Sequence, residues 1–301
     1  MNNSLISVVI PVYNYPEAFR KTLESVANQT YRDFEVHVVD DGSEEDIESV
    51  VKEISDERIR YHKLAHKNAN VARNYGVVQS KGEYIAMLDS DDIWLEDHLE
   101  KCLELLKEKN ADGLYGSLII NNVITNRKSI TYVCEPDKDE VMINYLLLRG
   151  YGAQSSTLFM SAESAKKVIW DPGLNRHQDY DFVVRYCKEY KMAAKETPTV
   201  IYNLRPKSHC DFESCIRFIK RVESEINPEV YHYYHKNMLE LAKRINAAPE
   251  IIKHYRNELT YHRELMSFKD FIQIKRPSSK LQFLKLKMQY IWHILRVRAA
   301  Y

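Results

Sequence analysis

The chain has 301 residues, of which 45% are hydrophobic and 29% are charged. This is the balance of a globular protein, and the length suits one large domain or a domain with an appendage. No stretch approaches the roughly 18 consecutive apolar residues of a membrane-spanning helix, so we expect that the chain does not cross a membrane.

The formal net charge of zero hides two oppositely charged parts. Residues 205–301 hold 19 Lys and Arg against 10 Asp and Glu, which leaves +9, so residues 1–204 carry −9. A basic tail on an acidic body predicts an anionic partner, either a membrane surface or a nucleic acid. We expect no nucleic acid, because the rest of the chain carries no signature of nucleic-acid binding.

The cysteines and the first residues predict the compartment. Five cysteines, an odd number without a CxxC pair, indicate free thiols in a reducing environment. The N-terminus lacks the basic and then apolar segments of a secretory signal peptide. We therefore predict a cytoplasmic protein, with peripheral attachment to the cytoplasmic membrane face as an option.

Predicted strands and helices alternate over the first 110 residues. A β-branched run at residues 5–13 predicts a strand buried on both faces, and Pro16 opens a helix. Further strands are predicted at residues 34–40, 58–64 and 83–88, and further helices at residues 44–54, 70–79 and 96–109. This alternation predicts an α/β fold with a mostly parallel sheet and right-handed crossovers.

The pattern changes twice further along the chain. After residue 111 it loosens into longer strand-like segments at residues 113–124 and 155–160 and a helix at residues 179–190. Beyond Arg205 only helices are predicted. We therefore predict one domain over residues 1–205, with halves at 1–110 and 111–205, and a basic helical region over residues 206–301.

Acidic residues end two of the predicted strands. Asp40 and Asp41 end one, and Asp89, Asp91 and Asp92 follow another within four residues. Ligands bind at the carboxyl ends of parallel strands, so these acids are expected to face one crevice. Such close carboxylates repel one another unless a cation joins them. The alternate carboxylates of "DSD" suit Mg²⁺ or Mn²⁺ held partly by substrate phosphates.

The first predicted strand lacks the glycines that many nucleotide-binding folds require. No glycine occurs before Gly42. Dinucleotide-binding and P-loop proteins need glycines after the first strand so that the backbone can approach phosphate. The sequence therefore argues against those proteins and against a nucleotidyltransferase with a glycine-rich first loop.

Four motifs carry a resemblance to a known family. They are "ISVVIPVYN", "SVANQTYRDFEVHVVDDGS", "NVARNYGVVQSKGEYIAMLDSDD" and "HQDYDFVVR", in that order. In their order and spacing the sequence resembles the inverting family 2 glycosyltransferases, over about residues 4–205. The resemblance implies a GT-A fold, which is a Rossmann-like domain, and transfer of a sugar from a nucleotide diphosphate. It also implies a DxD motif that holds a divalent cation on the diphosphate.

The resemblance also implies roles for single residues in donor binding. Asp41 would accept a hydrogen bond from uracil, and Asp40 would shape the same turn with Gly42. Arg73 would lie near the base or the diphosphate. The nucleotide-sugar site as a whole would comprise Pro11, Val12, Tyr13, Asp40, Asp41, Arg73, Asp89 and Arg205.

Metal ligands and a catalytic base follow from the same motifs. Asp91 would bind the metal directly, Asp89 would contact ribose or metal, and His209 would reach the metal or a phosphate after the last predicted strand. Asp92 is expected to cap the next helix or to support the other acids. Asp179 would be the base, and Gln178 replaces the acid that often precedes it in the family.

Two other functions stay open beside a glycosyltransferase. One is a nucleotidyltransferase, and the other is a non-catalytic protein of the same fold that binds sugars or lipid-linked glycans. The joint presence of Asp91 and Asp179 argues against the non-catalytic protein. We expect an enzyme of the hexosyl- or N-acetylhexosaminyltransferase class. We expect a UDP-sugar donor and a saccharide or lipid-linked saccharide acceptor, in the synthesis of a cell-surface polysaccharide.

The end of the chain has its own pattern. From Lys269 onward there are eight Lys and Arg and one Asp, and apolar residues recur at helical spacing. Basic helices with an apolar face lie in membrane interfaces. The tail is therefore expected either to contact a membrane or to pack against the catalytic domain.

Overall fold

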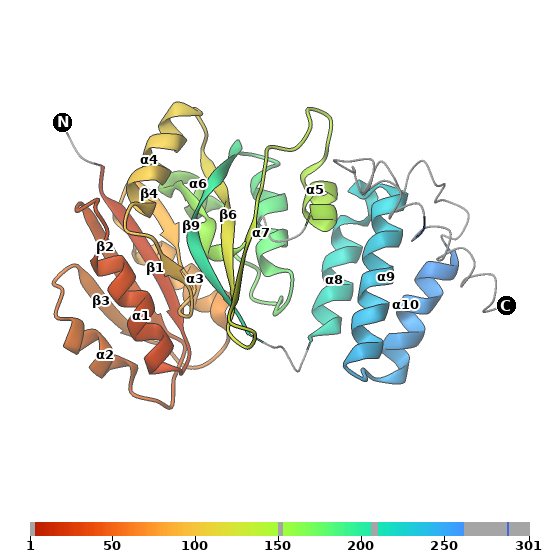
Figure 1. Ribbon diagram of the computed structural model, residues 1–301, viewed down its shortest axis with the longest axis horizontal. Helices are drawn as coiled ribbons and strands as arrows, with labels where there is room; N and C mark the ends of the chain where they lie inside the picture. The colour runs from red at the N-terminus through yellow and green to blue at the C-terminus, as the bar shows by residue number, and fades with distance from the viewer. Residues whose placement is uncertain (1–3, 150–152, 206–209, 262–287, 289–301) are drawn as a thin grey trace. The chain divides into compact units, whose positions relative to one another are not determined.

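In a computed structural model, residues 4–149, 153–205, 210–261 and 288 are described. The chain divides into two compact units, one with residues 1–142 and 151–218 and the other with residues 143–150 and 219–301. All strands of the described chain belong to the first unit, and the described part of the second is helical (Figure 1). The predicted division into domains at residue 205 stays a prediction.

The first unit is built around one sheet. Its strands, within the described residues, are β1 (Ile6–Val12), β2 (Phe34–Asp40), β3 (Ile59–Lys63), β4 (Tyr84–Met87), β5 (Ile93–Trp94), β6 (Gly113–Asn122), β7 (Arg127–Thr131), β8 (Phe159–Ser161) and β9 (Met192–Leu204). The strand order is β3-β2-β1-β4-β8-β6-β9-β5, and β7 pairs with β6. The sheet therefore joins the predicted first half of the domain to the second.

Six strands of this sheet point the same way. β1 to β4 pair in parallel, and β6 pairs in parallel with β9. β8 is antiparallel to both β4 and β6, so β6 and β9 run in the direction of β1. The carboxyl ends of these six strands consequently share one edge of the sheet, the edge where an α/β sheet binds its ligands.

The predicted α/β fold with a mostly parallel sheet is thereby confirmed. One segment differs from its prediction: residues 155–157, expected in a strand, form the short 3-10 helix η1 (Ser155–Thr157) before β8. The backbone N–H of Thr157 donates to the carbonyl of Gln154 at 2.9 Å. The β-branched and apolar residues of the segment are typical of a strand and gave no sign of this turn. Its serine side chains bind carboxylates elsewhere in the fold, which the sequence does not show.

Helices cover both faces of the sheet. In the first unit they are α1 (Pro16–Ala27), α2 (Ile47–Ile54), α3 (Ala69–Gln79), α4 (His98–Glu108), α6 (Ala162–Lys167) and α7 (Gln178–Tyr186), with α8 (Phe212–Val222) crossing the boundary. Val8 and Ile10 of β1 share a core with Phe19 of α1. Val9 faces the other way, where Gly76 of α3 lies so close that a Cβ would come within 2.4 Å of it. Burial on both faces explains the continuous apolar run of β1.

The second unit is held by helix packing and by polar contacts of its own. Its helices are α5 (Met142–Arg149), which begins one residue before the unit, η2 (Glu223–Glu225), α9 (Pro228–Arg244) and α10 (Pro249–Tyr261). Asn144 donates to the Glu225 carbonyl at 3.2 Å and accepts from the Asn227 N–H at 2.9 Å. Tyr231 of α9 donates to Glu258 of α10 at 3.0 Å. For residues 210–261 the predicted change from strands to helices is confirmed.

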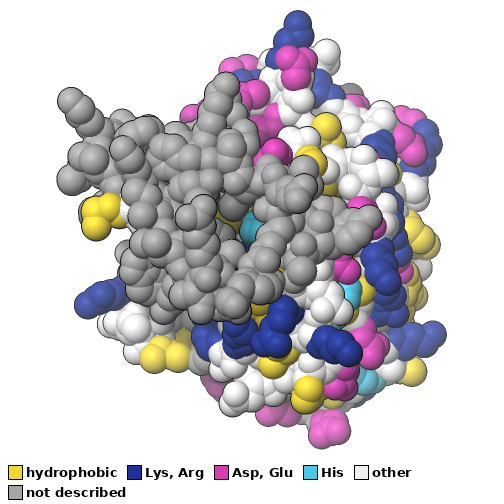
Figure 2. Space-filling model, turned by 90° about the vertical axis from the view of Figure 1, so that its right-hand side faces the viewer, with side chains coloured by type: hydrophobic (Ala, Val, Ile, Leu, Met, Phe, Trp, Pro, Cys, Tyr) yellow, Lys and Arg dark blue, Asp and Glu magenta, His cyan; other side chains and the backbone are white. Residues whose placement is uncertain are grey.

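One face of the described chain carries side chains of mixed character (Figure 2). Figure 2 shows acidic, basic and apolar side chains lying among one another over the described part of the face that it presents. Among the described residues, none of the helices has the length and apolar character needed to cross a membrane. The predicted amphipathic tail lies outside the described residues, with the exception of Met288.

A buried histidine makes the stability of the first unit depend on pH. His98 is fully buried, with Nδ1 2.7 Å from Oγ1 of Thr199 and its ring stacked on Trp94. Burial, with a smaller contribution from the charge of Lys195, holds the pKa of His98 well below its ordinary value. In the unfolded chain the same imidazole takes up a proton near about pH 6.5. The folded state therefore loses stability as the pH falls below that value.

We predict that the free energy of unfolding falls by up to about 1.4 kcal/mol per pH unit below about pH 6.5 because of this one group. The His98→Gln variant, which cannot take up the proton, should lose stability less steeply over the same range. Urea unfolding of both proteins at several pH values measures the two slopes. Equal slopes would show that His98 does not carry the effect.

Candidate functional site

The turns after β1 and β2 are locked together at the carboxyl edge of the sheet. Asn14 and Tyr15 both have positive φ angles, 58° and 60°, which is rare for a residue as bulky as tyrosine. The Asn14 N–H donates to Oγ of Ser43 at 2.8 Å, and the Asn14 side chain accepts from the Glu44 N–H at 3.0 Å. The Tyr15 N–H donates to Glu45 at 2.6 Å. These contacts compensate the strained backbone and hold Tyr13 and Tyr15 at the edge of the site.

Asp40 is a structural residue of the second turn. Its carboxylate is fully buried and accepts hydrogen bonds from the Ser43 N–H and from the Tyr61 hydroxyl. Burial and this hydrogen bond raise the pKa of Tyr61. Gly42 has φ +77°, and a Cβ there would come within 2.6 Å of the His66 backbone nitrogen. The structure thus agrees with Asp40 and Gly42 as the residues that shape this turn.

Asp41 points into a pocket beside the first turn. Its carboxylate accepts from the Lys67 N–H at 2.9 Å and lies 3.0 Å from Nδ1 of His66. The His66 ring stacks on Tyr13, with ring centroids 4.3 Å apart. The pocket has a volume of about 420 Å³ and is lined by Pro11, Val12, Tyr13, Tyr15, Asp41, Ala69, Arg73, Asp89, Ser90, Asp91 and Arg205. Most of the residues that we predicted for a nucleotide sugar therefore line one pocket.

Arg73 neutralises the first acid of the "DSDD" segment. It is buried on α3, and its guanidinium lies 2.6 Å from Oδ1 of Asp89. A second nitrogen donates to Asn70 at 2.9 Å, and Asn70 in turn donates to the carbonyls of Asp171 and Leu174. Complete burial would lower the pKa of Arg73, but the carboxylates of Asp89 and Asp179 more than offset this and raise it. Both carboxylates therefore act on the same guanidinium.

Asp92 fixes the acidic segment in place through its own side chain. Its carboxylate is buried and accepts from the Ser156 hydroxyl at 2.6 Å and from the Asn203 N–H at 3.1 Å. Burial, together with the charges of Asp89 and Asp91, raises the pKa of Asp92 well above its ordinary value. Helix α4 starts only at His98, so Asp92 is not its cap. Our expectation of a supporting acid is correct, and our expectation of a helix cap is wrong.

Two serines hold the two acidic parts of the site. Ser156 donates to Asp92 and also accepts from the Asp89 N–H at 3.1 Å. Its neighbour Ser155 donates to Oδ1 of Asp179, in the first turn of α7, at 2.6 Å. Both serines are fully buried in η1. The peptide between them consequently joins the "DSDD" segment to Asp179.

The hydroxyl group of Tyr202 on β9 lies near enough to four carboxylates to be affected by their charges. Burial raises the pKa of its hydroxyl, and the charges of Asp92, Asp89, Asp91 and Asp179 raise it further, in that order. The structure therefore brings Asp179 into the electrostatic neighbourhood of the three acids, although almost ninety residues of chain separate them. This arrangement was not evident from the individual motifs.

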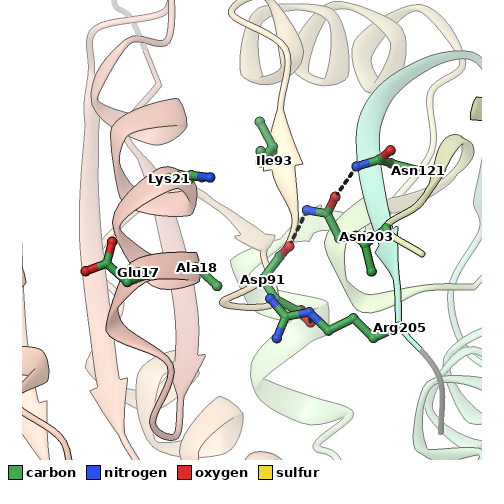
Figure 3. A pocket seen from close by; sticks show the side chains of 9 residues that line it. Glu17, Ala18, Lys21, Asp91, Ile93, Asn121, Asn203 and Arg205 are labelled. Carbon is green, nitrogen blue, oxygen red and sulfur yellow. Dashed lines mark hydrogen bonds and ion pairs between the residues drawn. The ribbon is translucent and has the colours of Figure 1, made fainter. Parts of the chain in front are cut away.

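A second pocket begins on the other side of Asp91. It has a volume of about 390 Å³ and is lined by Glu17, Ala18, Lys21, Asp91, Ile93, Asn121, Val123, Asn203 and Arg205. Figure 3 shows the Asn203 amide between Asp91 and Asn121: Asn121 donates to Asn203 at 2.8 Å, and Asn203 donates to the Asp91 carbonyl at 2.6 Å. The Arg205 guanidinium lies beside Asp91, with Nε 3.9 Å from Oδ2. Asp91 and Arg205 thus border both pockets.

The described residues offer few metal ligands in one place. Among residues 4–149, 153–205, 210–261 and 288, no three His, Cys, Asp or Glu side chains are grouped so that they could hold a metal ion. His209, which we predicted as a ligand, lies outside the described residues.

Comparison with known proteins assigns the family. Residues 7–164 match the family described as Glycosyl transferase family 2, which is more than half of the chain. The chain belongs to glycosyltransferase family 2. This membership agrees with the resemblance carried by the four sequence motifs.

Two relatives illustrate the range of this family. The chain is 31% identical over 215 residues to the amylovoran biosynthesis glycosyltransferase AmsB of Erwinia amylovora, covering 68% of this chain and 71% of AmsB. It is 35% identical over 139 residues to WfgD of Escherichia coli, covering 44% of this chain and 55% of WfgD. WfgD is a UDP-Glc:alpha-D-GlcNAc-diphosphoundecaprenol beta-1,3-glucosyltransferase. Several other curated relatives are longer, and the chain spans less than a fifth of them.

A solved structure supports the fold. S. aureus TarS 1-349 in complex with UDP-GlcNAc matches 93% of this chain and 79% of that chain with a TM-score of 0.57 and 17% identity. This likeness supports the predicted GT-A fold and carries no conclusion on substrate.

The sequence did not reveal the residues that hold the acids and Arg73 of this glycosyltransferase site in place. Ser155, Ser156, Asn203 and Asn70 hold the acids or Arg73, and none was predicted. All four are short polar residues in or beside apolar segments, and Ser155, Ser156 and Asn70 are fully buried. A polar residue in a buried segment needs a hydrogen-bond partner, which here is a residue of the site.

We predict that Ser156→Ala lowers the free energy of unfolding of this glycosyltransferase by about 1–3 kcal/mol. The substitution leaves the buried Asp92 carboxylate without one donor and the Asp89 N–H without its acceptor. Chemical denaturation measures the change, and Ser117→Ala serves as a matched control because Ser117 is also buried but accepts from the Val133 N–H alone. A smaller loss in Ser156→Ala than in the control would contradict a special role of Ser156.

Proposed function

We propose that the protein transfers a sugar, with inversion, from a UDP-sugar to a saccharide or lipid-linked saccharide. The observation that carries this proposal is the pair of neighbouring serines. One holds Asp92 and Asp89, and the other holds Asp179. A single displacement needs a base on one side of the anomeric carbon and stabilisation of the leaving diphosphate on the other. The serines support such an arrangement by fixing both groups to one short segment.

The donor pocket suits a nucleoside diphosphate. Tyr13 and Tyr15 are partly exposed at its rim and offer aromatic faces to a base. Asp41 is a buried carboxylate that can accept from an N–H of uracil. The Arg205 guanidinium lies 5.6 Å from the centroid of the Tyr15 ring and close to Asp91, where the diphosphate would lie. The relative WfgD is named for a UDP-Glc donor, which supports a UDP-sugar here.

The acids at the end of β4 fit a divalent cation. The side chain of Asp91 is 41% exposed and that of Asp89 is 27% exposed, so both can meet a ligand in the pocket. Asp89 is paired with Arg73, and Asp91 is therefore the principal ligand in our proposal, with Asp89 beside it. A bound Mn²⁺ or Mg²⁺ would neutralise negative charge on the diphosphate as UDP departs. His209 stays a predicted further ligand.

The reaction then needs only one protein base. The acceptor hydroxyl oxygen bonds to the anomeric carbon, its proton passes to the Asp179 carboxylate, and the bond from that carbon to the diphosphate oxygen breaks. The bonding electrons leave with UDP. Ser155 orients Asp179 through its hydrogen bond to Oδ1. Attack opposite the leaving group inverts the anomeric centre, so an α-linked donor gives a β-linked product.

Relatives suggest the class of acceptor. WfgD acts on a saccharide attached to diphosphoundecaprenol, and AmsB functions in amylovoran biosynthesis. We propose a lipid-linked saccharide of a surface polysaccharide as the acceptor of this chain. A cytoplasmic location with peripheral contact to the membrane stays a prediction. Family membership argues against the nucleotidyltransferase alternative, and a non-catalytic sugar-binding role is excluded if either test below succeeds.

We predict that EDTA abolishes release of UDP from the UDP-sugar and that Mn²⁺ or Mg²⁺ restores it. Without a cation the acids of the pocket repel the diphosphate. The Asp91→Ala variant should keep its fold but lose cation-dependent binding of UDP, measured by calorimetry. The Asp97→Ala variant is a control, because Asp97 is a partly exposed acid that pairs with Lys101 on α4. Full activity in EDTA would remove the cation from the mechanism.

We predict that Asp179→Asn binds UDP like the parent and transfers sugar at least about a hundredfold more slowly. The asparagine keeps the shape and the hydrogen bond from Ser155 but cannot take the proton. Ser155→Ala should slow transfer less, with UDP binding also unchanged, because the base remains but is less well oriented. A rate of Asp179→Asn within about threefold of the parental rate, or retention of configuration, would refute the assignment.

A further inference from the structure

The segment around the tip of the β6–β7 hairpin and β7 has more exposed large apolar side chains than any other segment of similar length in the described chain. Four of the eleven large apolar side chains that are exposed there lie within residues 123–132. They are Val123 (46% exposed), Ile124 (66%), Ile130 (47%) and Tyr132 (68%). Single exposed apolar residues are ordinary, but such a group marks an interaction surface.

The tip of this hairpin has a fixed shape. The Asn122 side chain accepts from the N–H groups of Ile124 and Thr125 at 3.1 and 3.0 Å. Asn126 completes the turn with a φ of 50°. Val123 and Ile124 are therefore held outward by the turn itself.

The hairpin is also positively charged. Residues 113–134 contain no Asp or Glu, whereas Arg127 and Lys128 are exposed directly after the tip. Apolar side chains beside cations, with a tyrosine further along, match the interface of a bilayer with anionic headgroups. A neutral or cationic partner would leave both charges without a counterpart.

The position of the hairpin connects it to the site. β6 ends at the same edge of the sheet as β1, β4 and β9, so its tip projects from the edge that carries the acids. Val123 lines the second pocket together with Asp91 and Arg205. Whatever the tip binds therefore lies beside the pocket entrance.

We propose that the tip of the β6–β7 hairpin, residues Val123, Ile124, Arg127 and Lys128, docks on an anionic lipid surface. Val123 and Ile124 enter the headgroup region, and the two cations contact lipid phosphates. In this position the site faces the layer from which a lipid-linked acceptor projects. That last consequence rests on the proposed function, whereas the docking itself does not.

A second copy of the chain is the less suitable occupant. The outer edge of β7 is a free strand edge among the described residues, but it carries Arg127 and Lys128. Charged side chains on an edge strand oppose pairing with another chain. Two copies would also bring four cations to one interface with no acid of either hairpin to balance them.

Fluorescence quenching tests the contact at the tip itself. Ile124→Trp and Val78→Trp each add one tryptophan at an exposed position to the same three native ones, and Val78 lies on α3 away from the hairpin. With vesicles of brominated anionic lipid, Ile124→Trp should lose more fluorescence than Val78→Trp. Equal quenching in the two variants would overturn the proposal, even if other parts of the chain bind the vesicles.

Vesicle sedimentation tests the chemistry of the contact. The double substitutions V123D/I124D and R127E/K128E should each weaken binding to anionic vesicles about tenfold. Val78→Asp and Lys107→Glu are matched controls at exposed positions and should bind like the parent. Unchanged binding of both hairpin variants would refute the proposal. So would a smaller molecular mass of V123D/I124D in light scattering, because a second copy would then be the occupant.

These measurements need no donor and no turnover. The Asp179→Asn variant should bind vesicles like the parent whether or not it transfers sugar. A failure of the proposed function thus stays distinguishable from a failure of the docking proposal.

Discussion

The site depends on how the protein accommodates three carboxylates within four residues. At the end of β4 the carboxylates of Asp89, Asp91 and Asp92 would repel one another, and the protein accommodates each of them in a different way. Asp89 is paired with the buried Arg73, and Asp92 is buried with two hydrogen-bond donors and a raised pKa. Asp91 alone borders both pockets. Two of the three carboxylates are thus paired or buried within the protein, and Asp91, beside Arg205, is the one that faces both pockets.

The strand order of the sheet brings together the residues that accommodate these three carboxylates. Because β1, β2, β4, β6 and β9 end at one edge, residues from distant parts of the chain surround the same acids. Asn203 reaches them from β9, and Thr22 of α1 donates to the Ser90 carbonyl at 2.9 Å. The antiparallel strand β8, with η1 before it, brings the serines between the two groups of parallel strands. Fold and site therefore rest on the same strand order.

Much of this arrangement was predictable from the sequence, and the reason is physical. Buried parallel strands need continuous apolar runs, so β1, β2 and β4 were found nearly at their observed bounds. Acids at the carboxyl ends of parallel strands lie where such sheets bind ligands, which singled out Asp41, Asp89 and Asp91. Their contacts could not be predicted: the partner of Arg73 and the burial of Asp92 depend on elements far apart in the sequence. Residues 155–157 were wrongly predicted as strand, because the hydrogen bonds from their serines to distant carboxylates cannot be seen in the sequence.

The adjacency of Ser155 and Ser156 has a consequence for how this enzyme can evolve. Consecutive Cα atoms are held about 3.8 Å apart by the planar trans peptide between them, whatever side chains they carry. Loops elsewhere can grow and shrink to admit new acceptors, since surface connections tolerate insertions well. An insertion between these two serines would instead shift the supports of Asp179 and of Asp92 at once. We therefore expect insertions to be tolerated better in the segments around η1 than within it.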